Sequence, residues 1–270
     1  MTIPAGKAPI LQSVRAAIAL WRAAVPRLLP LCAAAGALIV LVQLLAQAGG
    51  TGAAAPLLLV LLPLIVTFVY ASFLRHALEL PSDLAARARA AVSVAGAMAV
   101  VGGFLFLVFL VAGMPGANIF LTGAGVDIAS VPEDDVEAAM RVMEQALYAN
   151  PLLAALIFGF YTALWFFLSS RLYVAAPASA AENRVRSFET WSWTKDNMLR
   201  ITAARVILVV PAFLFFNLLG PRVLMTLADV SPALALAAQV VIETAALAVA
   251  WGLEACLSAY LYKGLRPPGR

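Results

Sequence analysis

The chain alternates between long apolar stretches and short polar segments. Three stretches contain no Asp, Glu, Lys or Arg, namely residues 28–74, 90–126 and 145–170. A helix needs about 20 mostly apolar residues to cross a bilayer, so the first stretch is long enough for two crossings, divided by the turn signal Gly49-Gly50-Thr51-Gly52. Backbone polar groups in a bilayer need internal partners, and the alternating pattern of a β-barrel is absent, so helices are expected. We predict an all-α membrane protein, a single polytopic domain over residues 1–270, with six transmembrane helices at about residues 30–48, 54–76, 91–113, 151–174, 202–220 and 234–262.

The composition agrees with a membrane environment. Hydrophobic residues make up 64% of the chain and charged residues 12%, with a mean hydropathy of +0.97, whereas soluble domains are roughly half apolar and a quarter charged. The net charge of +4 does not indicate a nucleic-acid partner, because the charges flank the predicted spans. Cys32 and Cys256 fall within predicted spans and lack metal-ligand spacing, so we expect neither a disulfide nor a metal, and no other cofactor.

The Lys and Arg residues predict the orientation of the chain. Cytoplasmic flanks of membrane spans carry an excess of these residues. Of the 18 Lys and Arg residues, only Arg141 and Arg222 fall on one side of the predicted spans, and the other sixteen fall on the opposite side. We therefore expect a multi-pass protein of the bacterial inner membrane, with the basic side and both termini in the cytoplasm.

The N-terminal region also has features of a secretory signal peptide. Arg15, Arg22 and Arg27 precede an apolar stretch that ends in Ala46-Gln47-Ala48, which fits the small-residue cleavage pattern. The basic region would be unusually long for such a signal, and a second apolar segment follows at once. An uncleaved first span is therefore expected.

The six spans are consistent with three repeated hairpins. Each odd-numbered span follows an amphipathic or polar lead-in, at residues 10–22, 81–90 and 187–200, of the kind that lies in a membrane interface. The even-numbered spans end alike, and aligning Leu74, Leu172 and Leu261 gives intervals of 98 and 89 residues. The alternative is that shared membrane composition produces this recurrence without a structural repeat.

One segment resembles a known bacterial family. The residues that carry the likeness are Arg171-Leu172-Tyr173, Pro177, Glu182-Asn183, Trp191–Lys195 and Leu199-Arg200-Ile201. This pattern resembles the membrane domain found ahead of some glycerophosphoryl diester phosphodiesterases, and similar stand-alone bacterial six-span proteins. The resemblance implies a helical membrane bundle. It does not imply phosphodiester hydrolysis, which belongs to a separate soluble domain in that family.

Glu243 and Glu254 are the best candidates for an intramembrane site. They lie eleven residues apart, within about 20° on one face of an α-helix, and Gln239 and Ser258 extend this stripe by four residues at each end. Ionisable groups at this depth are costly and often mark a pathway or a proton relay. The other interpretation is that each carboxyl group is protonated or hydrogen-bonded to a neighbouring span, and Arg205 is expected to pair with Glu254.

Two polar segments outside the spans are further candidates for binding. In the predicted cytoplasmic loop, basic residues favour a surface for lipid headgroups or a protein partner, although a solvated loop that sets the topology explains them as well. Residues 131–149 are predicted to form an acidic amphipathic helix, opened by capping-box spacing at Ser130-Val131-Pro132-Glu133. This helix is either a lid or docking surface, or a simple connector. The basic candidates are Arg171, at the end of the fourth predicted span, and, in the loop over residues 176–200, Arg184, Arg186, Lys195 and Arg200.

The sequence lacks the usual catalytic motifs. His76 is the only histidine, and the chain contains neither HExxH, GxSxG nor a phosphate-binding loop. We therefore predict a non-enzymatic inner-membrane protein, either a scaffold or a lipid-interacting factor of the bacterial envelope. The alternative is a transporter of small solutes or lipids that uses Glu243 and Glu254. The expected partners are membrane lipids and another membrane or envelope protein, and no nucleic acid.

Overall fold

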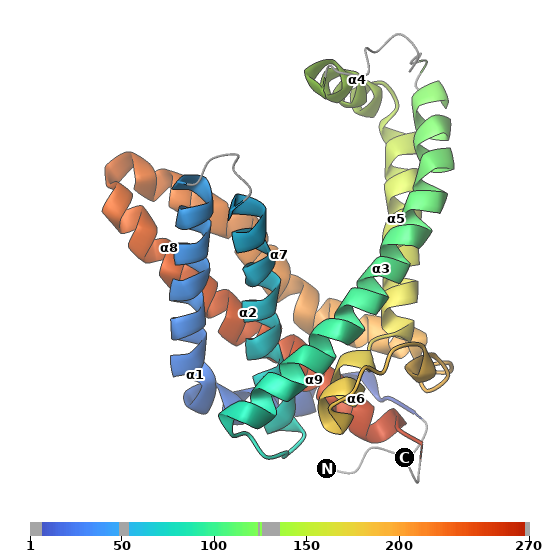
Figure 1. Ribbon diagram of the computed structural model, residues 1–270. Helices are drawn as coiled ribbons and strands as arrows, with labels where there is room; N and C mark the ends of the chain where they lie inside the picture. Colours follow the sequence, from blue (N-terminus) through green and yellow to red (C-terminus); the bar gives the residue numbers. More distant parts are fainter. Residues whose placement is uncertain (1–6, 49–53, 124, 126–135, 268–270) are drawn as a thin grey trace. The chain divides into compact units, whose positions relative to one another are not determined.

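The computed structural model describes residues 7–48, 54–123, 125 and 136–267, and these residues form helices without any β-strand. Six of the described helical stretches are long and apolar enough to cross a membrane. The prediction of an all-α, multi-pass membrane protein is therefore confirmed. The elements are α1 (Ile10–Ala48), α2 (Ala54–Ala77), α3 (Leu84–Gly123), α4 (Val136–Ala149), α5 (Pro151–Arg171), α6 (Ala175–Glu182), the 3-10 helix η2 (Phe188–Trp191), α7 (Met198–Val230), α8 (Pro232–Ala246), the π-helical turn η3 (Leu247–Trp251) and α9 (Gly252–Leu265), as drawn in Figure 1.

The chain divides into two compact units. Unit 1 contains residues 1–99 and 170–270, and unit 2 contains residues 100–169. Unit 1 therefore includes α1, α2, the first turns of α3, and α6 to α9. Unit 2 includes the remainder of α3, α4 and nearly all of α5. The single domain expected over residues 1–270 stays a prediction.

Unit 1 is held together by small residues that let its helices approach closely. A methyl group added at Gly36 of α1 would lie 2.6 Å from the Thr244 hydroxyl of α8, and one at Gly252 would lie 3.0 Å from the Trp21 ring. Transmembrane interfaces favour small residues because association there depends on van der Waals packing. The largest fully buried side chains include Phe73 and Leu257. Close backbone approach thus acts together with a core of buried apolar side chains in unit 1.

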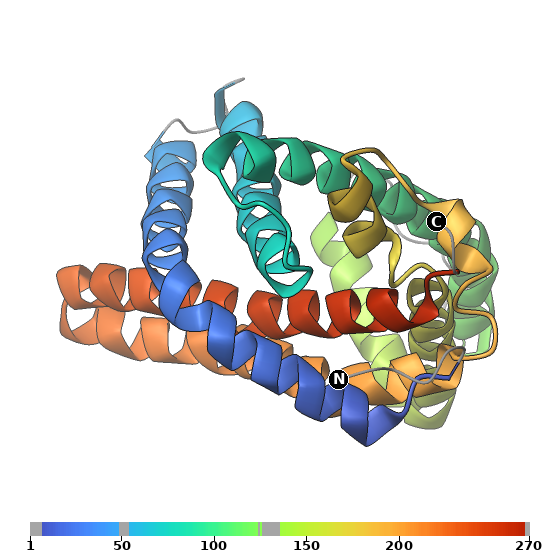
Figure 2. The ribbon, with the colours of Figure 1, turned by 90° about the horizontal axis from the view of Figure 1, so that it is seen from below.

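The first predicted lead-in and the first span form one bent helix. Helix α1 runs from Ile10 to Ala48 and contains Pro26 and Pro30, and Figure 2 shows its bend. Sharp kinks in helices usually occur at proline. The indole nitrogen of Trp21, before the bend, donates to the backbone oxygen of Ala248, 2.7 Å away. The lead-in is therefore anchored on the protein.

The other two lead-ins differ in form. The second merges with its span in the single helix α3, which begins at Leu84. The third contains the short helix η2 and turns before α7 begins at Met198. Superposition of three equivalent hairpins stays a prediction.

Polar contacts mark one end of unit 1. The backbone nitrogen of Ala8 donates to the side-chain oxygen of Asn197, 2.8 Å away, and Lys263 Nζ lies 3.0 Å from Glu79 Oε1. This hydrogen bond from Lys263 lowers the pKa of Glu79. The beginnings of α1 and α7 thus lie together, as do the ends of α2 and α9. We call this region the basic end.

Unit 2 is a smaller helical assembly. Phe120, Leu121, Ala146 and Ala154 form its buried cluster, and the Tyr161 hydroxyl donates to the backbone of α3. Helix α4 spans Val136–Ala149, which is the described part of the helix predicted over residues 131–149. Residues 131–135, and the capping box at 130–133, lie outside the described residues.

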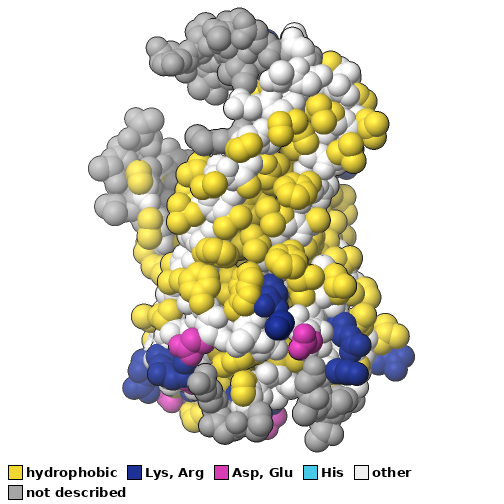
Figure 3. Space-filling model, turned by 90° about the vertical axis from the view of Figure 1, so that its right-hand side faces the viewer, with side chains coloured by type: hydrophobic (Ala, Val, Ile, Leu, Met, Phe, Trp, Pro, Cys, Tyr) yellow, Lys and Arg dark blue, Asp and Glu magenta, His cyan; other side chains and the backbone are white. Residues whose placement is uncertain are grey.

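Apolar side chains are exposed on the long helices. Phe106 is 66% exposed, Val241 66% and Leu214 51%. On the face shown in Figure 3, hydrophobic side chains dominate, and Lys, Arg, Asp and Glu gather in one zone of the view. Such exposure would be costly in water but suits a hydrocarbon solvent.

Candidate functional site

Glu254 lies in a polar cluster built from three parts of unit 1. Its Oε2 atom accepts a hydrogen bond from the Tyr173 hydroxyl, 2.9 Å away. Its Oε1 atom lies 3.9 Å from Nη2 of Arg205, and the two charged side chains are only 14% and 15% exposed. The Arg205 guanidinium also lies over the Tyr173 ring, 4.7 Å from its centroid. The predicted pairing of Arg205 with Glu254 is therefore confirmed.

Two hydroxyl groups complete this cluster. Nη1 of Arg205 donates to Ser170 Oγ, 3.4 Å away, and the Ser170 hydroxyl lies 2.8 Å from that of Thr202. These hydroxyl groups and Tyr173 were not predicted as partners of the ion pair. The polar run Ser169-Ser170-Arg171 at the end of α5 was the available signal.

Glu243 belongs to a second cluster, toward the opposite end of unit 1. Gln239 Nε2 donates to Gln43 Oε1, 2.7 Å away, and the Gln43 side chain lies beside the Glu243 side chain. Gln43 was not among the predicted site residues, although an amide within an otherwise apolar span is a recognisable signal. This cluster joins α8 to α1.

Ser258 has a third set of partners. Its hydroxyl lies 3.1 Å from the hydroxyl of Tyr70 on α2 and donates to the backbone oxygen of Ala255, 3.0 Å away. The Tyr70 ring meets Trp251 edge-on, with centroids 5.9 Å apart. Ser258 thus contributes to packing between α2 and α9.

The expected single stripe of Gln239, Glu243, Glu254 and Ser258 is wrong in one respect. The expectation assumed regular α-helical geometry, but the π-helical turn η3 lies between Glu243 and Glu254. A π turn contains one more residue than an α turn, so positions beyond it rotate by about 100° relative to the expected face. This rotation explains why the two carboxylates contact different helices.

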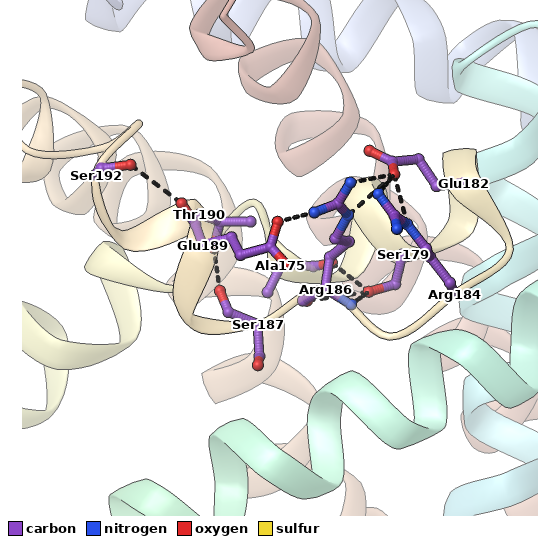
Figure 4. A network of polar contacts seen from close by, with 9 residues as sticks. All are labelled: Ala175, Ser179, Glu182, Arg184, Arg186, Ser187, Glu189, Thr190 and Ser192. Atoms are coloured by element: carbon purple, nitrogen blue, oxygen red, sulfur yellow. Dashed lines mark hydrogen bonds and ion pairs between the residues drawn. The ribbon is translucent and has the colours of Figure 1, made fainter. Parts of the chain in front are cut away.

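The loop after α6 forms a separate charged cluster, drawn in Figure 4. Glu182 Oε2 lies 2.9 Å from Arg184 Nη2 and 2.7 Å from Arg186 Nη2. Arg186 also pairs with Glu189. The Ser179 hydroxyl accepts a hydrogen bond from the Arg186 backbone nitrogen, 2.8 Å away. Arg186 therefore organises the loop, since it links α6 to η2.

The five basic residues that were predicted to form one surface lie in different environments. Arg184 and Arg186 share the cluster described above, while Lys195 and Arg200 are exposed elsewhere in the loop and at the start of α7. Arg171 is only 9% exposed, and its guanidinium lies 4.8 Å from the centroid of the Trp191 ring. The expectation of a surface role for Arg171 is corrected, because its planar group stacks on an aromatic face instead.

Two cavities lie near these clusters in unit 1. The apolar cavity, of about 630 Å³, lies among α2, the first turns of α3 and Trp251, and its lining includes Tyr70 and Gly96. The charged cavity, of about 600 Å³, lies beside α6 and the end of α9. Neither cavity is lined by Glu243 or Glu254. The lining of the charged cavity includes Glu182, Arg184, Arg186, Glu189, Tyr262 and Arg266.

The described residues contain no group of three or more His, Cys, Asp and Glu side chains placed to hold a metal ion. Cys32 and Cys256 are both buried as free thiols. The chemistry that this part of the chain offers is therefore ion pairing and hydrogen bonding by Arg, Glu, Gln and Tyr.

Comparison with protein families, with curated proteins and with solved structures finds no match. The resemblance of residues 171–201 to the membrane domain of glycerophosphoryl diester phosphodiesterases thus stays a prediction.

Proposed function

We propose that this protein is a non-enzymatic component of the bacterial inner membrane, a scaffold or lipid-interacting factor of the cell envelope. The observation that carries this proposal is the pairing of its intramembrane carboxyl groups. Glu254 is held by Tyr173 and Arg205, and Glu243 is engaged by Gln43. Such carboxyl groups link neighbouring helices of the bundle. They have a structural role, because removing one partner would leave a buried polar group unsatisfied.

The orientation proposed for the chain places the basic end in the cytoplasm. The excess of sixteen Lys and Arg residues over two across the predicted spans supports it. Reporter domains fused after residue 270 and into residues 136–149 would test it. We expect cytoplasmic activity for the first fusion and periplasmic activity for the second, and the reverse result would overturn the orientation.

A transporter is the alternative function, and one observation favours it. The π-helical turn η3 lies between Glu243 and Glu254, and such turns occur frequently at functional sites. In this alternative, at least one carboxyl group exchanges protons or binds a solute during transport. The ability of that carboxyl group to gain and lose a proton would then be essential for transport. A structural carboxyl group needs only its hydrogen-bond and ion-pair partners to stabilise the fold.

Glutamine replacement separates the two functions. Glu254→Gln keeps the side-chain volume and an acceptor for the Tyr173 hydroxyl but cannot titrate. Tyr173→Phe is the matched control, since it removes the hydrogen bond to Glu254 but leaves the titratable carboxyl group in place. Thermal stability in detergent is measured alongside complementation of a deletion strain, and Glu243→Gln is treated in the same way.

Under the proposed function, complementation follows stability, so Glu254→Gln and Tyr173→Phe support growth to similar extents. Loss of complementation by Glu254→Gln, at a stability no lower than that of Tyr173→Phe, would contradict the scaffold and favour transport. The same conclusion would follow if Glu243→Gln were stable and inactive.

A further inference from the structure

The charged cavity at the basic end carries an excess of positive charge. Its lining contains the three arginines Arg184, Arg186 and Arg266 and only two carboxylates, Glu182 and Glu189, which leaves a net charge of +1. A ligand with a single negative charge would neutralise it. Basic pockets between helices at a membrane surface are suited to anionic headgroups.

Two of the arginines are less committed to carboxylates than the third, although Arg184 contacts Glu182 through both Nε and Nη2. The Arg184 side chain is 60% exposed and touches Glu182 alone among the carboxylates. Arg266 lies 6.0 Å from the centroid of the Tyr262 ring and forms no ion pair within the described part of the chain. Arg186, in contrast, is committed to Glu182 and Glu189. Guanidinium groups bind phosphate oxygens through paired hydrogen bonds.

A buried hydroxyl group supplies independent evidence for a missing partner. Tyr262 lines the charged cavity and is only 3% exposed. Its hydroxyl has no hydrogen-bond partner among the described residues. Buried polar groups are nearly always hydrogen-bonded, so an unpartnered one calls for an explanation. A bound acceptor such as a phosphate oxygen provides it.

The surroundings of the cavity indicate that the ligand has an apolar part. Val185 lies between Arg184 and Arg186 and is 49% exposed. A methyl group added at Gly96 would lie 2.7 Å from Cγ2 of Val185, so Val185 packs against this glycine. Gly96 in turn lines the apolar cavity. Val185 lines neither cavity, but it stands between two arginines of the charged cavity and packs against a glycine of the apolar one. Apolar surface thus lies beside the charged cavity, as an amphiphile requires.

We propose that the charged cavity binds the phosphodiester group of a monoanionic phospholipid, with Arg184 and Arg266 on the phosphate oxygens and the Tyr262 hydroxyl as a further donor. The acyl chains lie on the side of Val185 and the apolar cavity. This inference rests on the proposed lipid-interacting function and names its ligand. A soluble glycerophosphodiester shares the headgroup chemistry, so the experiment includes both sources.

Native mass spectrometry of the full chain in detergent tests the proposal. Phosphatidylglycerol is titrated against phosphatidylcholine, which carries the same phosphodiester but no net charge, and against soluble glycerophosphoglycerol. The first variant is the double substitution Arg184→Gln with Arg266→Gln. Its matched control is Lys195→Gln with Arg200→Gln, which removes the same charge from exposed sites outside the cavity.

We expect phosphatidylglycerol to bind the native chain about tenfold more tightly than phosphatidylcholine does. The Arg184 and Arg266 double variant should lose about tenfold or more in affinity, in keeping with charge-assisted hydrogen bonds. The Lys195 and Arg200 control should change little. Tyr262→Phe should also weaken binding by about tenfold while leaving the fold intact, because the hydroxyl has no partner in the free protein.

The outcomes separate this inference from the proposed function. Equal losses in the cavity variant and its control, or equal binding of the two lipids, would overturn the specific site and leave a general lipid interaction standing. Soluble glycerophosphoglycerol binding as tightly as the lipid, with the same sensitivity to Arg184 and Arg266, would support the phosphodiester site and overturn the lipid function. Absence of binding by all three probes would overturn the site.

Discussion

The ion pair between Arg205 and Glu254 offers a quantitative test of how unit 1 is held together. At about 4 Å, two unit charges attract by about 4 kcal/mol at an effective dielectric constant of 20, and desolvation offsets a large part of this attraction. The 3.9 Å separation and low exposure of both side chains therefore lead us to expect a coupling energy of about 1–2 kcal/mol. The Tyr173 hydrogen bond contributes about 1.5–3 kcal/mol more to the stability that Glu254 provides.

A double-mutant cycle measures the coupling directly. Glu254→Gln, Arg205→Gln and the combined variant are unfolded reversibly in mixed micelles, and their free energies of unfolding are compared. Each single substitution should cost about 2 kcal/mol, because it leaves a buried polar group of the partner without its contact. The combined variant should cost less than the sum by the coupling energy. Additivity within about 0.5 kcal/mol would refute the ion pair as a stabilising contact.

Three further predictions concern packing, capping and the unpartnered hydroxyl. Gly36→Ala should lower the free energy of unfolding by about 1–3 kcal/mol, because the added methyl group would lie 2.6 Å from the Thr244 hydroxyl. Gly102→Ala, which has no neighbour within 4 Å, should be neutral or stabilising. Similar losses of stability at both sites would contradict close packing at Gly36. The pKa of Asp83 is lowered by a backbone hydrogen bond at the start of α3, so its contribution to stability is present above about pH 4 and lost as the pH falls through the lowered value. The stability advantage of the native chain over Asp83→Asn should therefore shrink in acid, and a growing advantage would be incompatible with this cap. Tyr262→Phe should raise stability by about 1 kcal/mol in lipid-free detergent, and a clear loss of stability would mean that the hydroxyl already has a partner.

The sequence by itself determined the features that depend on local composition. The cost of exposing backbone and polar groups to hydrocarbon acts on each segment separately, so the apolar runs predicted six spanning helices and the all-α class. Residue type also predicted the pairing of Arg205 with Glu254, because a charged group within a span requires a counter-charge. The amphipathic helix predicted over residues 131–149 also depends on a local property, because its apolar residues recur at helical intervals within one segment.

Only the tertiary structure decided how those local features combine. The π-helical turn Leu247–Trp251 changed the face on which Glu254 lies, which a count of α-helical turns cannot reveal. Stacking on Trp191 removed Arg171 from the surface. The charged cavity joins residues 182–189 with Tyr262 and Arg266, nearly eighty positions apart, because α6 packs against α9. Contacts between distant segments depend on close packing of whole helices, and the physical information that selects them is not contained in any one stretch of sequence.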